Sequence, residues 1–200
     1  VYPAELTRED MDACLADNPA QRDAVLDLRA VVKRATDAEK ERALETLTTY
    51  PTLDILHLGL REAIQNADDY FALPYSVAYA EDIMFIYDRL ITAANLVKED
   101  DVAFYRFLKL RAVDFLTDNY DGGDAAWVTG QFTGNLNAQI GSYETYDDAL
   151  YGVKSFFSLS LLQRDIEKSK ELAASIGDIQ AIEDAVPYTC PLNTSPSPRN

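Results

Sequence analysis

The longest regular pattern in the sequence is an apolar stripe at helical spacing that runs from about Ser76 to Val97. Apolar residues recur every three or four positions along it, which is the period of one face of an α-helix. A second helix is predicted from about Asp101 to Leu116. Its apolar side is formed by Phe104, Phe107, Leu108, Arg111, Ala112 and Phe115. The chain is therefore expected to be mainly helical.

Shorter periodic segments predict further helices, with Thr7 and either Thr36 or Asp37 as N-terminal caps. In addition to the helices that begin at these caps, others are expected from about Gln21 to Lys33, from about Leu53 to Asn66 and from about Asp147 to Ser175. The pattern changes between Ala125 and Tyr146, where Gly130, Gly134 and Gly141 interrupt any helix. In the same region, apolar and polar residues alternate as in a strand over Leu136-Asn137-Ala138-Gln139-Ile140. The predicted fold class is mainly α: a helical lobe with a short β segment around residues 135–146.

The C-terminal end has a different composition from the rest of the chain. Residues 187–200 hold four of the eight prolines, with Ser and Thr between them, and are predicted to form a tail or linker. Residues 1–186 are predicted to form one mainly helical lobe. The two cysteines, Cys14 and Cys190, would form a disulfide if the protein is exported and would otherwise be free thiols. The start at Val1 fits a mature exported protein, a trimmed chain or a piece of something longer.

Charge and hydropathy exclude several classes of partner. The formal net charge of −16 argues against nucleic acid and against anionic membrane surfaces, because both need clustered Lys and Arg. No apolar run approaches the roughly 18 residues that would suggest a membrane span. We therefore expect no nucleic-acid partner and no membrane partner.

The sequence lacks the common catalytic motifs. His57 is the only histidine, so this chain cannot supply the two or three histidines of a usual zinc site, and it is interpreted as a structural or surface residue. There is no G-x-S-x-G elbow and no G-x-x-x-x-G-K-[ST] phosphate loop. The acidic runs lack the ligand spacing of an EF-hand. No metal site and no cofactor are expected in this chain.

The segment from Trp127 to Asp148 is the best candidate for a binding site. In an extended chain, Glu144 and Tyr146 would lie on the same face. A carboxylate there can pair with the α-ammonium of a peptide, and a phenol can donate to a developing oxyanion. The alternative is that Glu144 caps or pairs with the following helix and that Tyr146 packs.

At these residues the sequence resembles the dipeptidyl peptidase III family of zinc metallopeptidases, in its bacterial-type branch. The similar run has a helix ending in a D-Y turn, a short piece of the type S-D-x-x-W, then I-G-x-x-E-x-Y-x-D and L-x-G-x-K. It is carried by Tyr105, Leu108, Arg111-Ala112, Leu116, Asp118-Asn119-Tyr120, Asp124-Ala125-Ala126-Trp127, Asn135, Ile140-Gly141, Glu144-Thr145-Tyr146, Asp148, Leu150, Gly152 and Lys154. Pro74-Tyr75-Ser76 and the helix after it are similar too, so the resemblance covers about Leu73 to Asp165.

The resemblance implies a two-lobed hydrolase with a wide cleft and a zinc lobe C-terminal to this region. Glu144 would anchor the amino terminus of the substrate, and Tyr146 would be catalytic by stabilising the tetrahedral intermediate. Asp148 is included among the substrate-binding positions, although it is more suited to fixing the turn between strand and helix. Zinc is expected in the missing C-terminal lobe.

These observations lead to one hypothesis and two alternatives. The chain is predicted to be the N-terminal substrate-binding lobe of such a peptidase, not catalytic by itself. Its partners would be a short peptide with a free amino terminus and the missing catalytic lobe. The alternatives are a stand-alone, non-catalytic peptide-binding module and a helical interaction protein.

Overall fold

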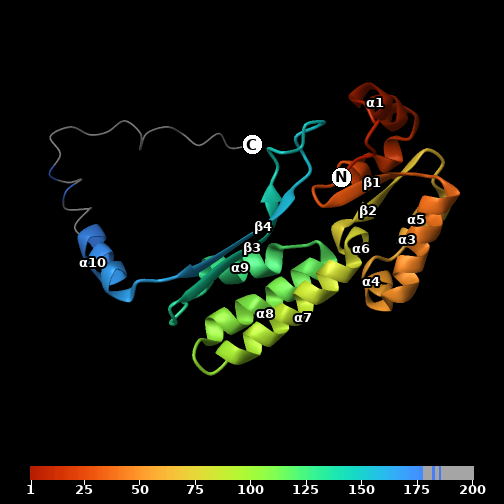
Figure 1. The fold of residues 1–200 in the computed structure, drawn as a ribbon. Coiled ribbons are helices and arrows are strands. Elements are labelled where there is room, and N and C mark those ends of the chain that lie inside the picture. The colour runs from red at the N-terminus through yellow and green to blue at the C-terminus, as the bar shows by residue number, and fades with distance from the viewer. Residues whose placement is uncertain (178–181, 183–184, 186–200) are drawn as a thin grey trace. The chain divides into compact units, whose positions relative to one another are not determined.

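The computed structural model describes residues 1–177, 182 and 185 (Figure 1). The chain divides into two compact units, Val1–Leu162 and Gln163–Asn200. The helices of the first unit are α1 (Arg8–Asp17), α2 (Arg22–Val25), α3 (Asp37–Thr49), α4 (Pro51–Leu56), α5 (Leu60–Asn66), α6 (Tyr75–Ala78), α7 (Ala80–Val97), α8 (Val102–Thr117) and α9 (Asp121–Thr129). The strands are β1 (Ala30–Arg34), β2 (Tyr70–Pro74), β3 (Leu136–Glu144) and β4 (Phe156–Gln163). The second unit contains α10 (Ile166–Gly177). The predicted tail at 187–200 and Cys190 lie outside the described residues.

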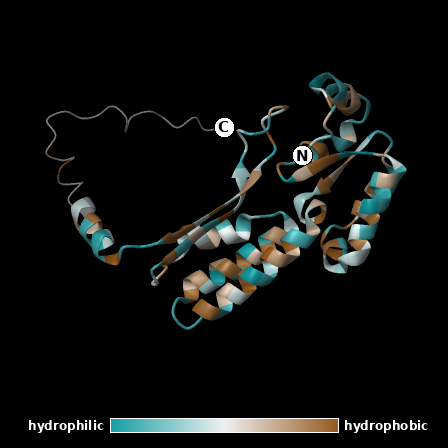
Figure 2. Ribbon diagram, viewed as in Figure 1, coloured by the Kyte–Doolittle hydropathy of each residue, from teal (hydrophilic) through white to brown (hydrophobic). Residues whose placement is uncertain are grey.

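The two long predicted helices are found as α7 and α8, which pack along each other as a hairpin (Figure 1). The first was expected to begin at about Ser76, but Tyr75–Ala78 forms the separate helix α6 and α7 begins at Ala80. Along both, hydrophobic and hydrophilic residues alternate (Figure 2). The buried stripe of α8 includes Phe107, Ala112 and Phe115, as its spacing predicted. The hairpin forms the centre of the larger apolar cluster, to which α3, α4, α5, β2 and β3 also contribute.

The prediction of one helix from Gln21 to Lys33 is wrong. The helix ends with α2 at Val25, and the chain continues as β1, which pairs antiparallel with β2 so that Val32 lies opposite Ala72. Val31 and Val32 are buried in this strand. β-branched residues favour a strand once a partner is present, and here the partner lies about 40 residues away in sequence.

The β segment predicted around residues 135–146 is confirmed as β3, but the surrounding elements differ from the prediction. The expected helix from Asp147 to Ser175 is wrong over its first half, because residues 156–163 form β4 and pair with β3. The Ser-Leu-Ser-Leu alternation at 158–161 has the period of a strand. Before β3, Asp121-Gly122-Gly123 would favour a turn by composition, but helix α9 begins there. The fold class is mainly α with short β segments, as predicted.

A smaller apolar cluster joins the N-terminal segment to the first sheet. Its buried members are Leu6, Met11, Cys14, Leu15, Val25, Val32 and Tyr70. Cys14 is buried within it, whereas its predicted partner Cys190 is outside the described residues. The disulfide therefore stays a prediction.

Candidate functional site

Glu144 is the last residue of β3 and lies at the edge of a surface pocket of about 400 Å³. The pocket lies between β3, α8 and α9, and also includes Ser158 of β4. Its walls are formed by Phe107, Trp127, Val128, Ala138 and Ile140. The side chain of Glu144 is exposed and takes part in no hydrogen bond or ion pair with the described residues. It is therefore available to bind a ligand.

Tyr146 lies two residues beyond the end of β3, in a turn, and its side chain is 78% exposed. The backbone N–H of Asp148 donates to the Thr145 carbonyl at 3.1 Å, which closes this turn. The extended conformation from which a shared face was predicted thus stops at Glu144. Tyr146 is not among the residues that line the pocket, so its joint action with Glu144 stays a prediction.

Asp148 organises the loop that follows β3. Its buried carboxylate accepts hydrogen bonds from the Tyr2 hydroxyl at 3.2 Å and from four backbone N–H groups, those of Leu150, Tyr151, Val153 and Lys154, at 2.9 to 3.3 Å. Burial acts to raise the pKa of Asp148, but the backbone N–H groups outweigh it and lower the pKa. These contacts describe a carboxylate that fixes a loop between two strands, where a strand-to-helix turn was expected. A contact with substrate stays a prediction.

Tyr143, next to Glu144, is held by two charged residues from α8 and α9. Arg111 is 3% exposed, and its guanidinium donates to Asp124 Oδ1 at 2.5 Å and to the Tyr143 hydroxyl. The Tyr143 hydroxyl in turn donates to Asp124 Oδ1. Burial, together with the bond to Asp124, raises the pKa of Tyr143 to about 12, so the phenol stays protonated. We call Arg111, Asp124 and Tyr143 the Tyr143 clamp.

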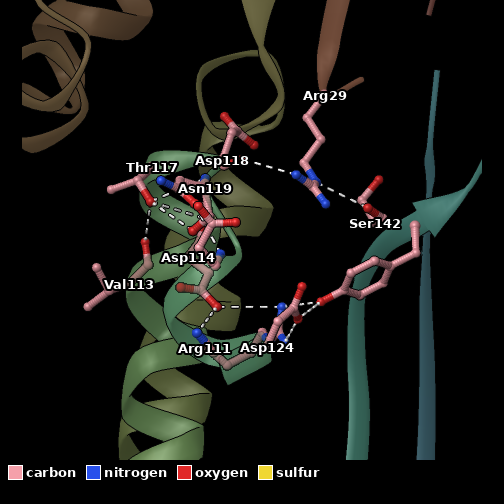
Figure 3. A network of polar contacts seen from close by, with 12 residues as sticks. Arg29, Arg111, Val113, Asp114, Thr117, Asp118, Asn119, Asp124 and Ser142 are labelled. Carbon is pink, nitrogen blue, oxygen red and sulfur yellow. Dashed lines mark hydrogen bonds and ion pairs between the residues drawn. The ribbon is translucent and has the colours of Figure 1, made fainter. Parts of the chain in front are cut away.

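A second carboxylate completes the neutralisation of Arg111. Asp114 Oδ2 lies 3.5 Å from Arg111 Nη1 and accepts the backbone N–H of Gly123 at 3.0 Å (Figure 3). Burial raises the pKa of Asp114 to about 6. A Cβ at Gly123 would lie 2.0 Å from Asp114 Oδ2, so only glycine allows α9 to begin this close to α8.

Arg29, in the loop before β1, binds Ser142, the residue of β3 that precedes Tyr143. Its Nε donates to the Ser142 carbonyl at 3.0 Å and its Nη1 to the Asp118 carbonyl at 3.2 Å (Figure 3). The guanidinium lies 3.8 Å from the ring centroid of Tyr120. The buried Ser142 hydroxyl also contacts the Ser155 hydroxyl at 2.7 Å. Ser142 is therefore held through both its backbone and its side chain.

Sequence reasoning missed Arg29, Asp124 and Tyr143 as a group, because they come from segments up to 114 positions apart. Arg111 did carry a signal. It occupies a position on the apolar side of α8, and a buried arginine requires carboxylate partners.

His57 has a structural role, as predicted. Its Nε2 lies 2.7 Å from the Ser76 hydroxyl and 3.2 Å from the Leu116 carbonyl. Burial lowers its pKa.

Within the described part of the chain, no group of three or more His, Cys, Asp and Glu side chains could hold a metal ion. The described residues therefore provide no zinc site, and the family resemblance places the zinc in a separate lobe. None of the described helices is both long and apolar enough to cross a membrane.

Comparison with known proteins links this fold to one family. No family model matches the chain. It is 24% identical over 187 residues to Nudix hydrolase 3 from Arabidopsis thaliana, a match that covers 93% of this chain and 22% of that protein. The structure of DPP III from Caldithrix abyssi matches with a TM-score of 0.68 and 26% identity, over 93% of this chain and 29% of that one. Dipeptidyl-peptidase III from Corallococcus sp. strain EGB matches with a TM-score of 0.63 and 24% identity, over 93% and 28%.

The chain thus spans less than a third of the length of each protein that it matches. The name Nudix hydrolase 3 belongs to the whole plant protein, of which the match covers only 22%. Partial coverage of both peptidase structures is consistent with the predicted single N-terminal lobe. Over nearly its whole length, the chain has the fold of a portion of bacterial dipeptidyl peptidase III, which confirms its resemblance to that family.

Proposed function

We propose that this chain is the substrate-binding lobe of a dipeptidyl peptidase III-like zinc peptidase and that it binds short peptides by their free amino terminus. The observation that carries the proposal is the structural match to DPP III from Caldithrix abyssi over 93% of the chain. The unpartnered carboxylate of Glu144 at the edge of a pocket adds support, since it lies at the position that the resemblance assigns to substrate binding.

In this proposal, Glu144 and Tyr146 act on different parts of the peptide. The carboxylate of Glu144 accepts charge-assisted hydrogen bonds from the α-ammonium. The hydroxyl of Tyr146 donates to the oxygen of the scissile carbonyl when negative charge develops there. Its exposed position in the turn after β3 leaves it accessible to a substrate.

Hydrolysis is proposed to need another part of the protein. Metal activation of water requires a ligand set that the described residues do not provide. The chain alone would then bind peptides without cleaving them. A stand-alone peptide-binding module would behave in the same way and differs only in having no catalytic partner lobe, whereas a helical interaction protein would not bind peptides.

The test measures the affinity of the chain for tetra-alanine and for N-acetyl-tetra-alanine by calorimetry. We expect the free amino terminus to be preferred. Glu144→Gln should reduce that preference by about tenfold, because an uncharged amide loses the charge-assisted bonds. Glu41→Gln, a change at an exposed position on α3, is the matched control and should keep it. Tyr146→Phe should leave the preference intact, since the phenol is assigned to the scissile carbonyl.

Two results would contradict the proposal. If the wild-type chain binds neither peptide, the helical interaction protein is the better description. If the wild-type chain prefers the free amino terminus and Glu144→Gln keeps that preference, Glu144 is not the anchor.

A further inference from the structure

We propose that the Tyr143 clamp, whose residues line the same pocket as Glu144, is a positioning device for Glu144, and that the hydroxyl of Tyr143 thereby contributes to selectivity for a free amino terminus. This inference rests on the proposed function. It assigns a role to Arg111, Asp124 and Tyr143 beyond their contribution to packing.

The need for a positioning device follows from the surroundings of Glu144. Its side chain has no hydrogen bond or ion pair with any described residue, so no polar contact fixes its rotamer. It also stands at the end of β3, where the ladder with β4 stops and a turn begins. A binding carboxylate in such a place keeps its geometry only if the backbone that carries it is held.

The structure holds the two residues immediately before Glu144. Ser142 is fixed through its carbonyl by Arg29 and through its hydroxyl by Ser155. Tyr143 is fixed at the far end of its side chain, because its hydroxyl accepts from Arg111 and donates to Asp124. The ring of Tyr143 also lies 5.5 Å from that of Tyr120, centroid to centroid. Tyr143 directly precedes Glu144 and lines the same pocket, so anchoring its side chain holds the backbone from which Glu144 extends.

The positive charge of Arg111 in the clamp is paired with other carboxylates, so it does not neutralise Glu144. Arg111 is a buried cation that lines the same pocket as Glu144, and an unpaired guanidinium there would compete with a peptide ammonium for Glu144. Instead, Arg111 is paired with Asp124 at 2.5 Å and with Asp114 at 3.5 Å. The charged residues that line the pocket are Arg111, Asp124 and Glu144, so one positive charge is present for two negative charges. The pocket therefore keeps a net negative charge, which suits a cationic group.

The test is Tyr143→Phe, which removes the hydroxyl and keeps the ring that packs against Tyr120. The readout is the ratio of affinities for tetra-alanine and N-acetyl-tetra-alanine. We expect this ratio to fall by about threefold to tenfold, the effect of losing a hydrogen bond in a positioned network. Tyr151→Phe is the matched control: its hydroxyl donates to Asp12 Oδ1 at 2.6 Å, neither residue lines the pocket, and its loss should leave the ratio unchanged.

The outcomes separate this inference from the proposed function. A wild-type chain without preference for the free amino terminus overturns both. A wild-type preference that Glu144→Gln abolishes and Tyr143→Phe leaves intact overturns the clamp alone. A loss of affinity for both peptides in equal proportion in Tyr143→Phe also overturns it, because general destabilisation lowers both affinities and a misplaced Glu144 lowers only one.

Discussion

At the scale of single residues, one carboxylate at the end of α8 lies in a buried place that disfavours its ionised form. Asp118 terminates α8 in the left-handed region, with φ of 56°. Its Oδ2 accepts the backbone N–H of Ser76 at 2.9 Å, whereas its Oδ1 is buried and has no hydrogen-bond partner. Burial raises the pKa of Asp118 to about 6, and the bonds from Ser76 and the charge of Arg29 only partly oppose this. Ionisation of Asp118 is therefore less favourable in the folded chain than in water.

Asp118→Asn should stabilise the protein at neutral pH. The folded pKa of about 6 lies above the unfolded value near 3.8, so the contribution of Asp118 is fully present below about pH 4 and is lost as pH rises through 6. Asparagine keeps an acceptor for Ser76, tolerates a positive φ and cannot ionise. We expect the difference in free energy of unfolding between variant and wild type to grow between pH 4 and 7 by on the order of 1–3 kcal/mol.

Urea denaturation across this pH range measures that difference. Asp88→Asn, at an exposed carboxylate on α7, is the control and should give the same small difference at every pH. A difference for Asp118→Asn that is constant from pH 4 to 7 would show that Asp118 does not titrate as described.

At the scale of elements, sequence periodicity predicted what depends on local spacing and missed what depends on distant pairing. The helices α7 and α8 were predicted because each carries its own apolar stripe, whereas their packing as a hairpin was not predicted. β1 was mistaken for helix because its strand conformation depends on β2, far along the chain. β4 was missed although Ser158 to Leu161 alternate, because the surrounding residues also fit a helix. In the candidate site, Glu144 was found from its motif, but its supporting residues meet only through the tertiary fold.

The start of α8 illustrates how one side chain joins two elements. Asp101 is buried, and its Oδ1 caps the helix by accepting the Phe104 N–H at 2.9 Å. Its Oδ2 accepts the N–H of Gly134, in the segment before β3, at 2.8 Å. We expect Asp101→Ala to lower the free energy of unfolding by about 2–4 kcal/mol, because a cap and a buried acceptor are lost together.

Thr36→Ala provides the comparison for this prediction. Thr36 caps α3 by accepting the Glu39 N–H at 3.3 Å in an exposed position, so its loss should cost only about 1 kcal/mol. Chemical denaturation of the two variants measures both costs. Equal losses would mean that the bond between Asp101 and Gly134 adds nothing to the cap.

At the scale of the whole molecule, the chain corresponds to a portion of each peptidase structure that it matches. The chain matches less than a third of each peptidase structure, and its described residues contain no metal-ligand group. We therefore expect the purified chain to contain no stoichiometric zinc. Removing metal with a chelator should leave its melting temperature unchanged, because a metal that does not bind the native state cannot stabilise it.

Elemental analysis and thermal melting with and without EDTA check this expectation. Incubation with tetra-alanine, followed by mass spectrometry, checks for release of dipeptides. Zinc at one equivalent per chain together with dipeptide release would show that the chain is a complete peptidase, contrary to the proposal.

Trp127 allows binding in the pocket to be followed by intrinsic fluorescence. It is the only tryptophan in the chain, it lines the same pocket as Glu144, and its indole Nε1 donates to Asn137 Oδ1 at 3.0 Å. When only indole is excited, all the fluorescence of the unlabelled chain originates beside this pocket. Any molecule that displaces water there changes the polarity around the indole and shifts its emission. The chain thus carries a built-in reporter, and ligand libraries can be screened against it without attaching a dye.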